Sequence, residues 1–146
     1  MSTNAIRINE INARLRTLRT NLNNEVSARN RVRVRLEDLK RADSRLDNLL
    51  NEYFGFPDEY CSLHAPVERL CFCGSRRDEI ETRLNDICES LKTQRSRHEE
   101  HAVTLKNRIR TDESLEDRHS TTINSINSQI SNLEAERRRL QMMDSN

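Results

Sequence analysis

Four side chains in one short stretch of the chain could hold a metal ion. They are Cys61 and His64, separated by two residues, and Cys71 and Cys73, separated by one. Thiolates and imidazoles are the ligands that a tetrahedral structural zinc prefers. The Cys-x-Cys half departs from the common Cys-x-x-Cys spacing, which leaves two alternatives: a disulfide from Cys61 to Cys71 or Cys73, and reduced cysteines packed among apolar neighbours. We favour the reduced cysteines and expect no bound cofactor.

The remaining reactive side chains point to structure more than to catalysis. We interpret Cys88 as a small residue at the edge of a helical seam, and His98 and His101 as exposed or partly buried in a weak part of that seam, with a metal or pH-sensing site as the alternative. Only His64 could serve as a base for a thiol nucleophile. The sequence carries no phosphate-cradling loop, nucleotide fingerprint or catalytic serine or carboxylate constellation. We expect a protein that is not an enzyme.

The composition favours helices over a thick globular core. Of 146 residues only 34% are apolar and 3% aromatic, whereas 34% are charged. Both glycines and both prolines fall within residues 54–74, so this stretch is predicted to connect two long helices. No apolar run approaches 18 residues and no charged-then-apolar leader opens the chain. We therefore expect no membrane span and no cleavable signal peptide, and a cytoplasmic protein that could be exported with its partner.

Apolar residues at alternating steps of three and four predict a coiled-coil-like seam on both helices. The first helix is expected over about residues 4–53, the connector over 54–74, and the second helix over about 75–143. The second helix would either bend at 111–121, where the pattern becomes polar, or continue unbroken with last turns that overhang the first helix and await a partner. These elements form one domain, an all-α elongated antiparallel helical hairpin. The seam comprises Ile8, Ile11, Leu15, Leu18, Leu22, Val32, Leu36, Leu39, Leu46, Leu50 and Tyr53, then Ile80, Leu84, Ile87, Leu91, Leu105, Ile109, Ile123, Ile126, Ile130, Leu133 and Leu140.

Local signals predict the helix ends. Gly55 is expected in the left-handed conformation that ends the first helix, with Pro57 preventing its continuation. A short helical turn is expected after Pro66, and the second helix is expected to start at Ser75, just after Gly74. The apolar side chains of the connector would then either seal the end of the hairpin or dock on a partner.

Charged residues along the first helix bear on its partners. Glu25, Arg29 and Asp43 occupy seam positions, where buried polar groups weaken packing but can specify register. Arginines at every second position over residues 29–35 are scattered over two helix faces, and we interpret them as a solvated surface. Lys and Arg number 25 against 24 Asp and Glu. This near-neutral balance and the lack of aromatic residues argue against nucleic acid as a partner.

One tripeptide connects these features to a known family. Phe72, Cys73 and Gly74 form an aromatic-x-Gly at the mouth of the second helix, which resembles the motif of the WXG-type proteins of type VII (ESX-like) secretion. The chain length, the long first helix and the pattern INSQISNLEAERRRL at residues 126–140 resemble more closely the small helical partners encoded with LXG toxins in Gram-positive bacteria. Phe72 stands where that motif has tryptophan. Phe54 and Asp58 match an F-x-x-x-D motif of some such partners, although here it lies in the connector.

The resemblance implies a function. Such a partner, together with a second small helical partner, binds the helical N-terminal region of an LXG-type toxin, and the secretion machinery recognises the complex. It implies an export signal at Phe54, Asp58, Phe72 and Gly74, and a partner-binding seam at Leu15, Leu18, Leu22, Val32, Leu36, Leu39, Leu46, Ile123, Ile126, Ile130 and Leu133. The alternative is a self-associating coiled-coil scaffold whose tip is stabilised by zinc or a disulfide. Neither alternative involves membrane insertion.

Overall fold

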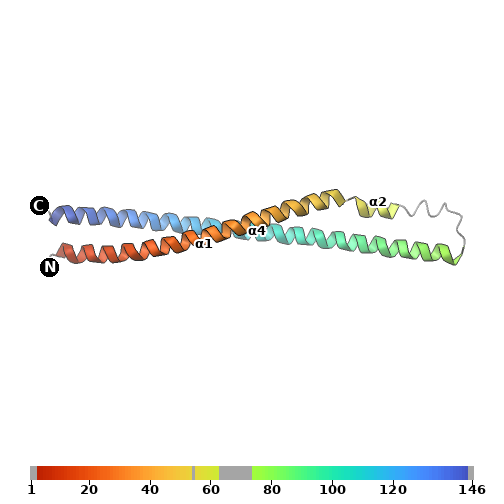
Figure 1. Ribbon diagram of the computed structural model, residues 1–146, viewed down its shortest axis with the longest axis horizontal. Coiled ribbons are helices and arrows are strands. Elements are labelled where there is room, and N and C mark those ends of the chain that lie inside the picture. The colour runs from red at the N-terminus through yellow and green to blue at the C-terminus, as the bar shows by residue number, and fades with distance from the viewer. Residues whose placement is uncertain (1–2, 54, 63–73, 145–146) are drawn as a thin grey trace. The chain divides into compact units, whose positions relative to one another are not determined.

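The computed structural model describes residues 3–53, 55–62 and 74–144, and every described element is a helix. Helix α1 spans Thr3–Tyr53, α2 spans Phe56–Ser62 and α4 spans Ser75–Asp144 (Figure 1). The chain divides into two compact units: unit 1 holds residues 1–37 and 110–146, and unit 2 holds residues 38–109. Within each unit, α1 and α4 pack against each other in antiparallel directions. The predicted all-α helical-hairpin class is confirmed.

The end of α1 differs from the prediction. Gly55 does not adopt the left-handed conformation. Of the two glycines, both of which are described, Gly74 has a positive φ, of 82°, and Gly55 does not. Instead the carbonyl of Gly55 accepts a hydrogen bond of 2.9 Å from the amide of Glu59, within a new turn that becomes α2. Pro57 stands in the first turn of α2, where its missing N–H costs nothing. The chain therefore changes direction between Tyr53 and Phe56 and resumes as a helix. The helical turn expected after Pro66 lies outside the described residues.

The second long helix begins where the sequence predicted. Ser75 is its first residue, and the carbonyl of Gly74 accepts a hydrogen bond of 3.0 Å from the amide of Arg77. Gly74 takes a conformation that L side chains rarely adopt, so a glycine suits this entry. From there α4 continues for 70 residues and passes through 111–121 without interruption. The polar residues expected to bend it remain helical because they are paired with α1.

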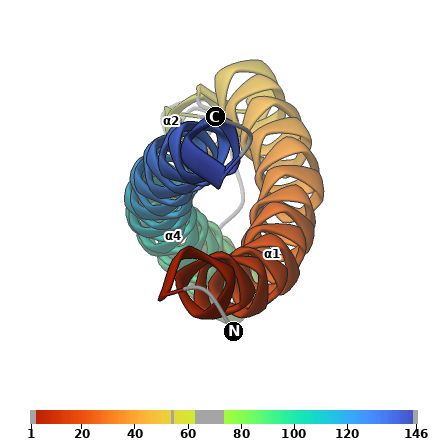
Figure 2. The same ribbon diagram turned by 90° about the vertical axis from the view of Figure 1, so that its left-hand side faces the viewer.

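Unit 1 contains a closed seam between α1 and α4. Figure 2 views it from the end at which α1 begins and α4 ends. Ile11 and Leu15 are each 2% exposed on α1, and Ile123 and Ile126 are buried on α4. Together with Leu18, Val32 and Leu36 these side chains bury the apolar face of both helices. Burial of this kind contributes most of the stability of a helix pair, since isolated helices are marginal in water.

Unit 2 repeats the arrangement with a sparser core. Its buried hydrophobic residues among those described are Cys88, Ala102 and Ile109, and Pro57 of α2 is also buried. The leucines of this unit on α1 are half-buried or exposed, and Leu49 is 52% exposed. Ala102 and Cys88 are small, so they fill less of the space between the helices than the isoleucines of unit 1. Unit 2 is therefore the more open of the two units.

The seam of α4 follows a register that differs in one place from the predicted one. The sequence assigned Ile80 and Ile87 to the seam, but these side chains are 37% and 44% exposed, while Cys88 is buried at 6% exposure. Steps of four and three run back without a break from Ile126 through Ile109 to Cys88. A coiled-coil register is continuous along a helix, so the strong apolar repeat near the C-terminus decides which residue of the Ile87–Cys88 pair turns inward. Tyr53, also assigned to the seam, is 57% exposed.

Candidate functional site

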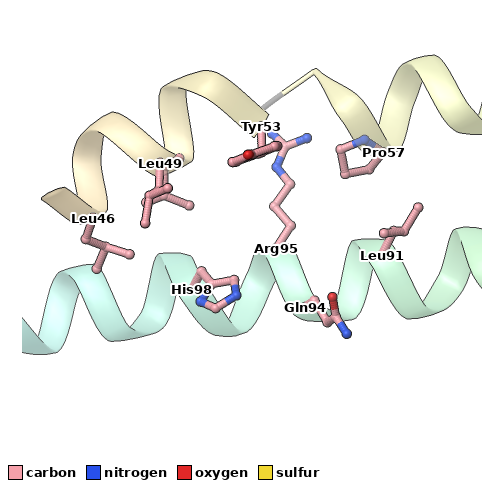
Figure 3. Close-up of a pocket in the computed structure, with 9 residues that line it drawn as sticks. Leu46, Leu49, Tyr53, Pro57, Leu91, Gln94, Arg95 and His98 are labelled. Atoms are coloured by element: carbon pink, nitrogen blue, oxygen red, sulfur yellow. The ribbon is translucent and has the colours of Figure 1, made fainter.

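A largely apolar concave surface lies in unit 2. It is an apolar groove of about 380 Å³ between α1, α2 and α4, and we refer to it as the unit 2 groove. Its lining residues are Leu46, Leu49, Leu50 and Tyr53 from α1, Pro57 from α2, and Leu91, Gln94, Arg95 and His98 from α4 (Figure 3). Six of these nine side chains are apolar or aromatic. A concave surface of this composition is typical of a site that binds apolar groups.

The groove arises from the spacing of leucines along α1. Leu46, Leu49, Leu50 and Tyr53 recur at steps of three and four, which places them along one side of the helix. Leu46 and Leu50 are half-buried, whereas Leu49 and Tyr53 are 52% and 57% exposed. In Figure 3 Arg95 extends from α4 toward Tyr53, and Pro57 stands on the far side of Arg95. The opposing side chains of α4 leave the apolar row on α1 partly uncovered.

Polar groups of α4 stand along the groove. The guanidinium of Arg95 pairs with the carboxylate of Asp58 at 3.3 Å and with that of Glu99 at 3.1 Å. The ring of His98 meets the ring of His101 edge to face, with centroids 6.2 Å apart. Arg95 occupies a seam position of α4, where an apolar residue would otherwise cover the leucines of α1. Two carboxylates thus orient a charged group at a position where the seam would otherwise hold an apolar side chain.

The predicted partner-binding seam lies mostly in unit 1, where it is already occupied. Leu15, Leu18, Val32, Leu36, Ile123 and Ile126 are buried, and Ile130 and Leu133 are half-buried. These side chains pack α1 against α4 of the same chain, so they are not open to a second chain in this structure. Leu22 and Leu39 are also half-buried, and Leu46 is the member of the set that lines the groove.

The predicted export signal is only partly described. Phe54 and Phe72 lie outside the described residues, as do His64, Cys71 and Cys73 of the predicted zinc site, and the side chain of Cys61 is likewise outside. Asp58 is exposed at the first turn of α2 and forms the ion pair with Arg95. Gly74 stands immediately before α4. Among the described residues, no three His, Cys, Asp or Glu side chains are grouped as metal ligands would be.

Cys88 is buried in unit 2 and is disulfide-bonded. The prediction of a small residue at the seam is right in its position, since this side chain is 6% exposed. Its disulfide bond was not predicted. Sequence spacing considered only pairings within residues 61–73, because Cys88 lies on another element and its distance from them depends on the fold.

Polar seam positions of unit 1 form ion pairs between the helices. Asp112, at 1% exposure, accepts a hydrogen bond of 2.8 Å from the guanidinium of Arg35, which also reaches its second carboxylate oxygen. The hydrogen bond to Asp112 raises the pKa of Arg35 above its ordinary value. Glu25 and His119 meet at 2.7 Å. The arginines predicted to form a solvated surface are exposed at positions 31, 33 and 35, and Arg35 also forms an ion pair with α4.

A second ion pair joins the same part of α1 to α4. Arg33 pairs with Glu116 of α4, one helical turn from the Arg35–Asp112 pair. Bidentate arginine–carboxylate contacts fix geometry as well as charge. These pairs bind the polar residues of 111–121 to α1, which explains why α4 stays helical there.

Comparison with protein-family models, with curated proteins and with solved structures returned no match. The function must therefore be inferred from the geometry described above and from the resemblance stated for the sequence. Within the described residues, no helix is both long enough and apolar enough to cross a membrane.

Sequence reasoning missed two residues of the groove. Leu49 lies beside the predicted seam positions Leu46 and Leu50, and Arg95 follows Leu91 by four residues, at the next step of the α4 register. The signal that could have found Arg95 was the unbroken register from the C-terminal isoleucines. It would also have indicated Asp112 as a buried seam position, because 109, 112 and 116 follow the same steps of three and four.

Proposed function

We propose that this protein is a non-enzymatic partner protein whose unit 2 groove receives the apolar face of an amphipathic helix from a second chain. By the resemblance, that helix belongs to the N-terminal region of an LXG-type toxin, and the complex is exported by a type VII secretion system. The observation that carries the proposal is the exposure of Leu49 and Tyr53, at 52% and 57%, beside a groove of about 380 Å³.

The shape of the groove favours a helical occupant. Its apolar row on α1 repeats at steps of three and four over residues 46–53, and a helix presents anchors with the same repeat. α1 and α4 already form two sides, so a third helix would complete a three-helix seam. A helix that docks in this way buries leucines that unit 2 leaves exposed, at roughly 25 cal/mol for each Å² removed from water.

The polar side chains of the groove favour particular residues beside the apolar face of the docked helix. Gln94, Arg95 and His98 present donors from α4. Arg95 is already oriented by Asp58 and Glu99, so an incoming helix gains most from neutral polar or acidic residues beside its apolar face. An amphipathic helix carries both kinds of residue, with apolar side chains on one face and polar side chains beside them.

The disulfide at Cys88 supports an exported protein. Disulfides persist in oxidising environments and are rare where thiols are kept reduced. A protein that leaves the cell with its partner meets such an environment, and the bond then stabilises the unit with the sparser core.

Groove variants test the helix-docking step. The chain is co-expressed with the helical N-terminal regions of LXG toxins from the same genome, and the complex is measured by light scattering and calorimetry. Leu49→Asp with Tyr53→Asp should weaken binding by at least tenfold, on the order of 1.4 kcal/mol. Val103→Asp is the matched control, because Val103 is 60% exposed in unit 2 but does not line the groove. Equal binding by wild type and the double variant would contradict docking in the groove.

Export is tested separately at the connector. Phe54→Ala with Phe72→Ala should leave helicity and complex formation intact and abolish secretion of the toxin, if these aromatic residues are the signal. Asp58→Asn tests the carboxylate in the same assay. Unchanged export by the double phenylalanine variant would remove the export-signal assignment while leaving helix docking in place.

A self-associating scaffold is the second candidate, and the disulfide-bonded Cys88 is the observation that favours it. In that case the groove of one copy would receive a helix of another. A purified chain that forms a tight homo-oligomer under oxidising conditions, and does not exchange into a complex with the toxin region, would support the scaffold over the secretion partner.

A further inference from the structure

A second concave surface lies in unit 1, separate in sequence and chemistry from the unit 2 groove. It has a volume of about 380 Å³ and is lined mainly by cationic and carboxamide side chains. We refer to it as the arginine pocket, and its residues are Asn9, Asn12, Leu15, Arg16, Arg19 and Arg137. The seam residue Leu15, 2% exposed, forms its apolar floor.

The two helices of unit 1 bring these side chains together. Asn9, Asn12, Arg16 and Arg19 recur at steps of three, four and three, so they share one side of α1 next to the seam. Arg137 enters from α4, and its guanidinium donates a hydrogen bond of 3.2 Å to the side-chain oxygen of Asn12. This bond positions Arg137 and turns the amide nitrogen of Asn12 into an available donor.

The pocket holds more donors than it has acceptors. The Nε of Arg137 is buried and has no hydrogen-bond partner among the described residues. The guanidinium of Arg16 likewise forms no ion pair or side-chain hydrogen bond within the described part of the chain. Arg19 donates to Glu134 at 2.9 Å. A buried donor without an acceptor costs free energy, and the exposed guanidinium of Arg16 is the donor that an anion in the pocket can reach.

The charge of the pocket indicates which anion fits. Arg16, Arg19 and Arg137 contribute three positive charges, and Glu134, paired with Arg19, contributes one negative charge. The balance of about +2 matches a phosphate group, which carries about −1.5 to −2 at pH 7 and offers three acceptor oxygens. A carboxylate carries half that charge and could be satisfied by one guanidinium fork.

We propose that the arginine pocket binds a phosphate group. Arg137, oriented by Asn12, donates from its remaining amines, Arg16 supplies a second guanidinium, and Arg19 balances the charge of Glu134 from α4. This site does not depend on helix docking in unit 2, because the two surfaces share no residue.

Calorimetric titration with inorganic phosphate and with pyrophosphate, at constant ionic strength set by chloride, tests the site on the full chain. Wild type should bind both ions, and Arg137→Gln and Arg16→Gln should each weaken binding by about tenfold. Arg31→Gln is the matched control. Arg31 is exposed in unit 1 and outside the pocket, and it forms no side-chain pair among the described residues. This variant should change the affinity by less than about twofold.

Three outcomes would overturn the proposal. These are phosphate binding no stronger than chloride, equal weakening by Arg31→Gln and the pocket variants, or glutarate binding as tightly as phosphate. The last would assign the pocket to carboxylates. Circular dichroism of each variant checks that it is folded, and Arg16→Gln keeps the test valid if Arg137→Gln unfolds, because Arg16 is exposed. Tight binding of phosphorylated or lipid headgroup probes over inorganic phosphate would identify the source of the phosphate and support the site.

Discussion

Units 1 and 2 are built from the same two helices and the same steps of three and four, yet one seam is closed and the other is open. Unit 1 places isoleucine and leucine at facing positions, with Ile11 and Leu15 each 2% exposed. Unit 2 buries the small side chains of Ala102 and Cys88 and places the cationic Arg95 beside its leucines, of which Leu49 is 52% exposed. The periodicity of a seam thus predicts where helices meet, while side-chain volume and charge decide whether the interface is filled.

The polar residues in the two seams also differ in their roles. In unit 1, Arg35 contacts both carboxylate oxygens of Asp112, which is 1% exposed, although the side chain of Arg35 itself is 46% exposed. In unit 2, Arg95 pairs with carboxylates that lie at the surface, and Asp58 is 72% exposed in its side chain. In unit 1 the more buried partner of the pair is the carboxylate of Asp112, whereas in unit 2 it is the guanidinium of Arg95, whose side chain is 26% exposed.

Truncating a core side chain of unit 1 should have the largest effect on the stability of the protein. Ile11→Ala leaves a cavity at a position 2% exposed and should lower the free energy of unfolding by about 2–4 kcal/mol. Urea unfolding followed by circular dichroism measures the change. Thr17→Ala, at an exposed position of the same helix, is the control and should have little effect. A loss below about 1 kcal/mol would show that the unit 1 seam contributes less than its burial indicates.

Removing the disulfide should have the next largest effect, and should act on unit 2. Few apolar residues are buried there, so a covalent bond at Cys88 replaces part of the missing core. Cys88→Ser should lower the free energy of unfolding by roughly 2–3 kcal/mol under oxidising conditions. Thermal unfolding with and without dithiothreitol provides the check. The wild type should lose stability on reduction and approach the variant, and a melting temperature independent of reductant would exclude a stabilising role for this bond.

Changing the buried carboxylate of unit 1 should have an intermediate effect. Asp112→Asn keeps the volume but removes the charge that Arg35 contacts, and should lower the melting temperature by roughly 5 °C. Glu116→Gln, at the more exposed pair with Arg33, should lower it by less. Because the hydrogen bond to Asp112 raises the pKa of Arg35, the charge of this arginine is lost only in strong alkali, and the ranking of the variants should persist across neutral pH.

Truncation in the unit 2 groove should have the smallest effect on stability. Leu49→Ala removes a side chain that is 52% exposed, so the free energy of unfolding should change by less than about 0.5 kcal/mol. Urea unfolding of Leu49→Ala and Ile11→Ala under the same conditions compares the two losses of stability directly. If Leu49→Ala destabilised the free chain as much as Ile11→Ala does, the groove would be part of the core and not a surface kept open for a partner.

The sequence by itself determined the helices and most of the seam. Long polar stretches without glycine or proline predicted helices over about 4–53 and 75–143, and the structure has Thr3–Tyr53 and Ser75–Asp144. Apolar repeats identified Ile11, Leu15 and Ile123 as inward-facing, because a helix has a fixed period. Gly74 before Ser75 located the start of the second helix, since local backbone chemistry controls helix ends.

Only the tertiary structure decided what the local pattern left ambiguous. Whether Ile87 or Cys88 turns inward depends on register carried from the far end of α4, and the pairing of Asp112 with Arg35 joins residues 77 positions apart. The groove and the arginine pocket need both helices, since each is lined from α1 and α4. Periodicity along one helix specifies a face. The tertiary structure decides which distant residues lie opposite that face. The size and charge of those residues then decide whether the interface is filled or left exposed.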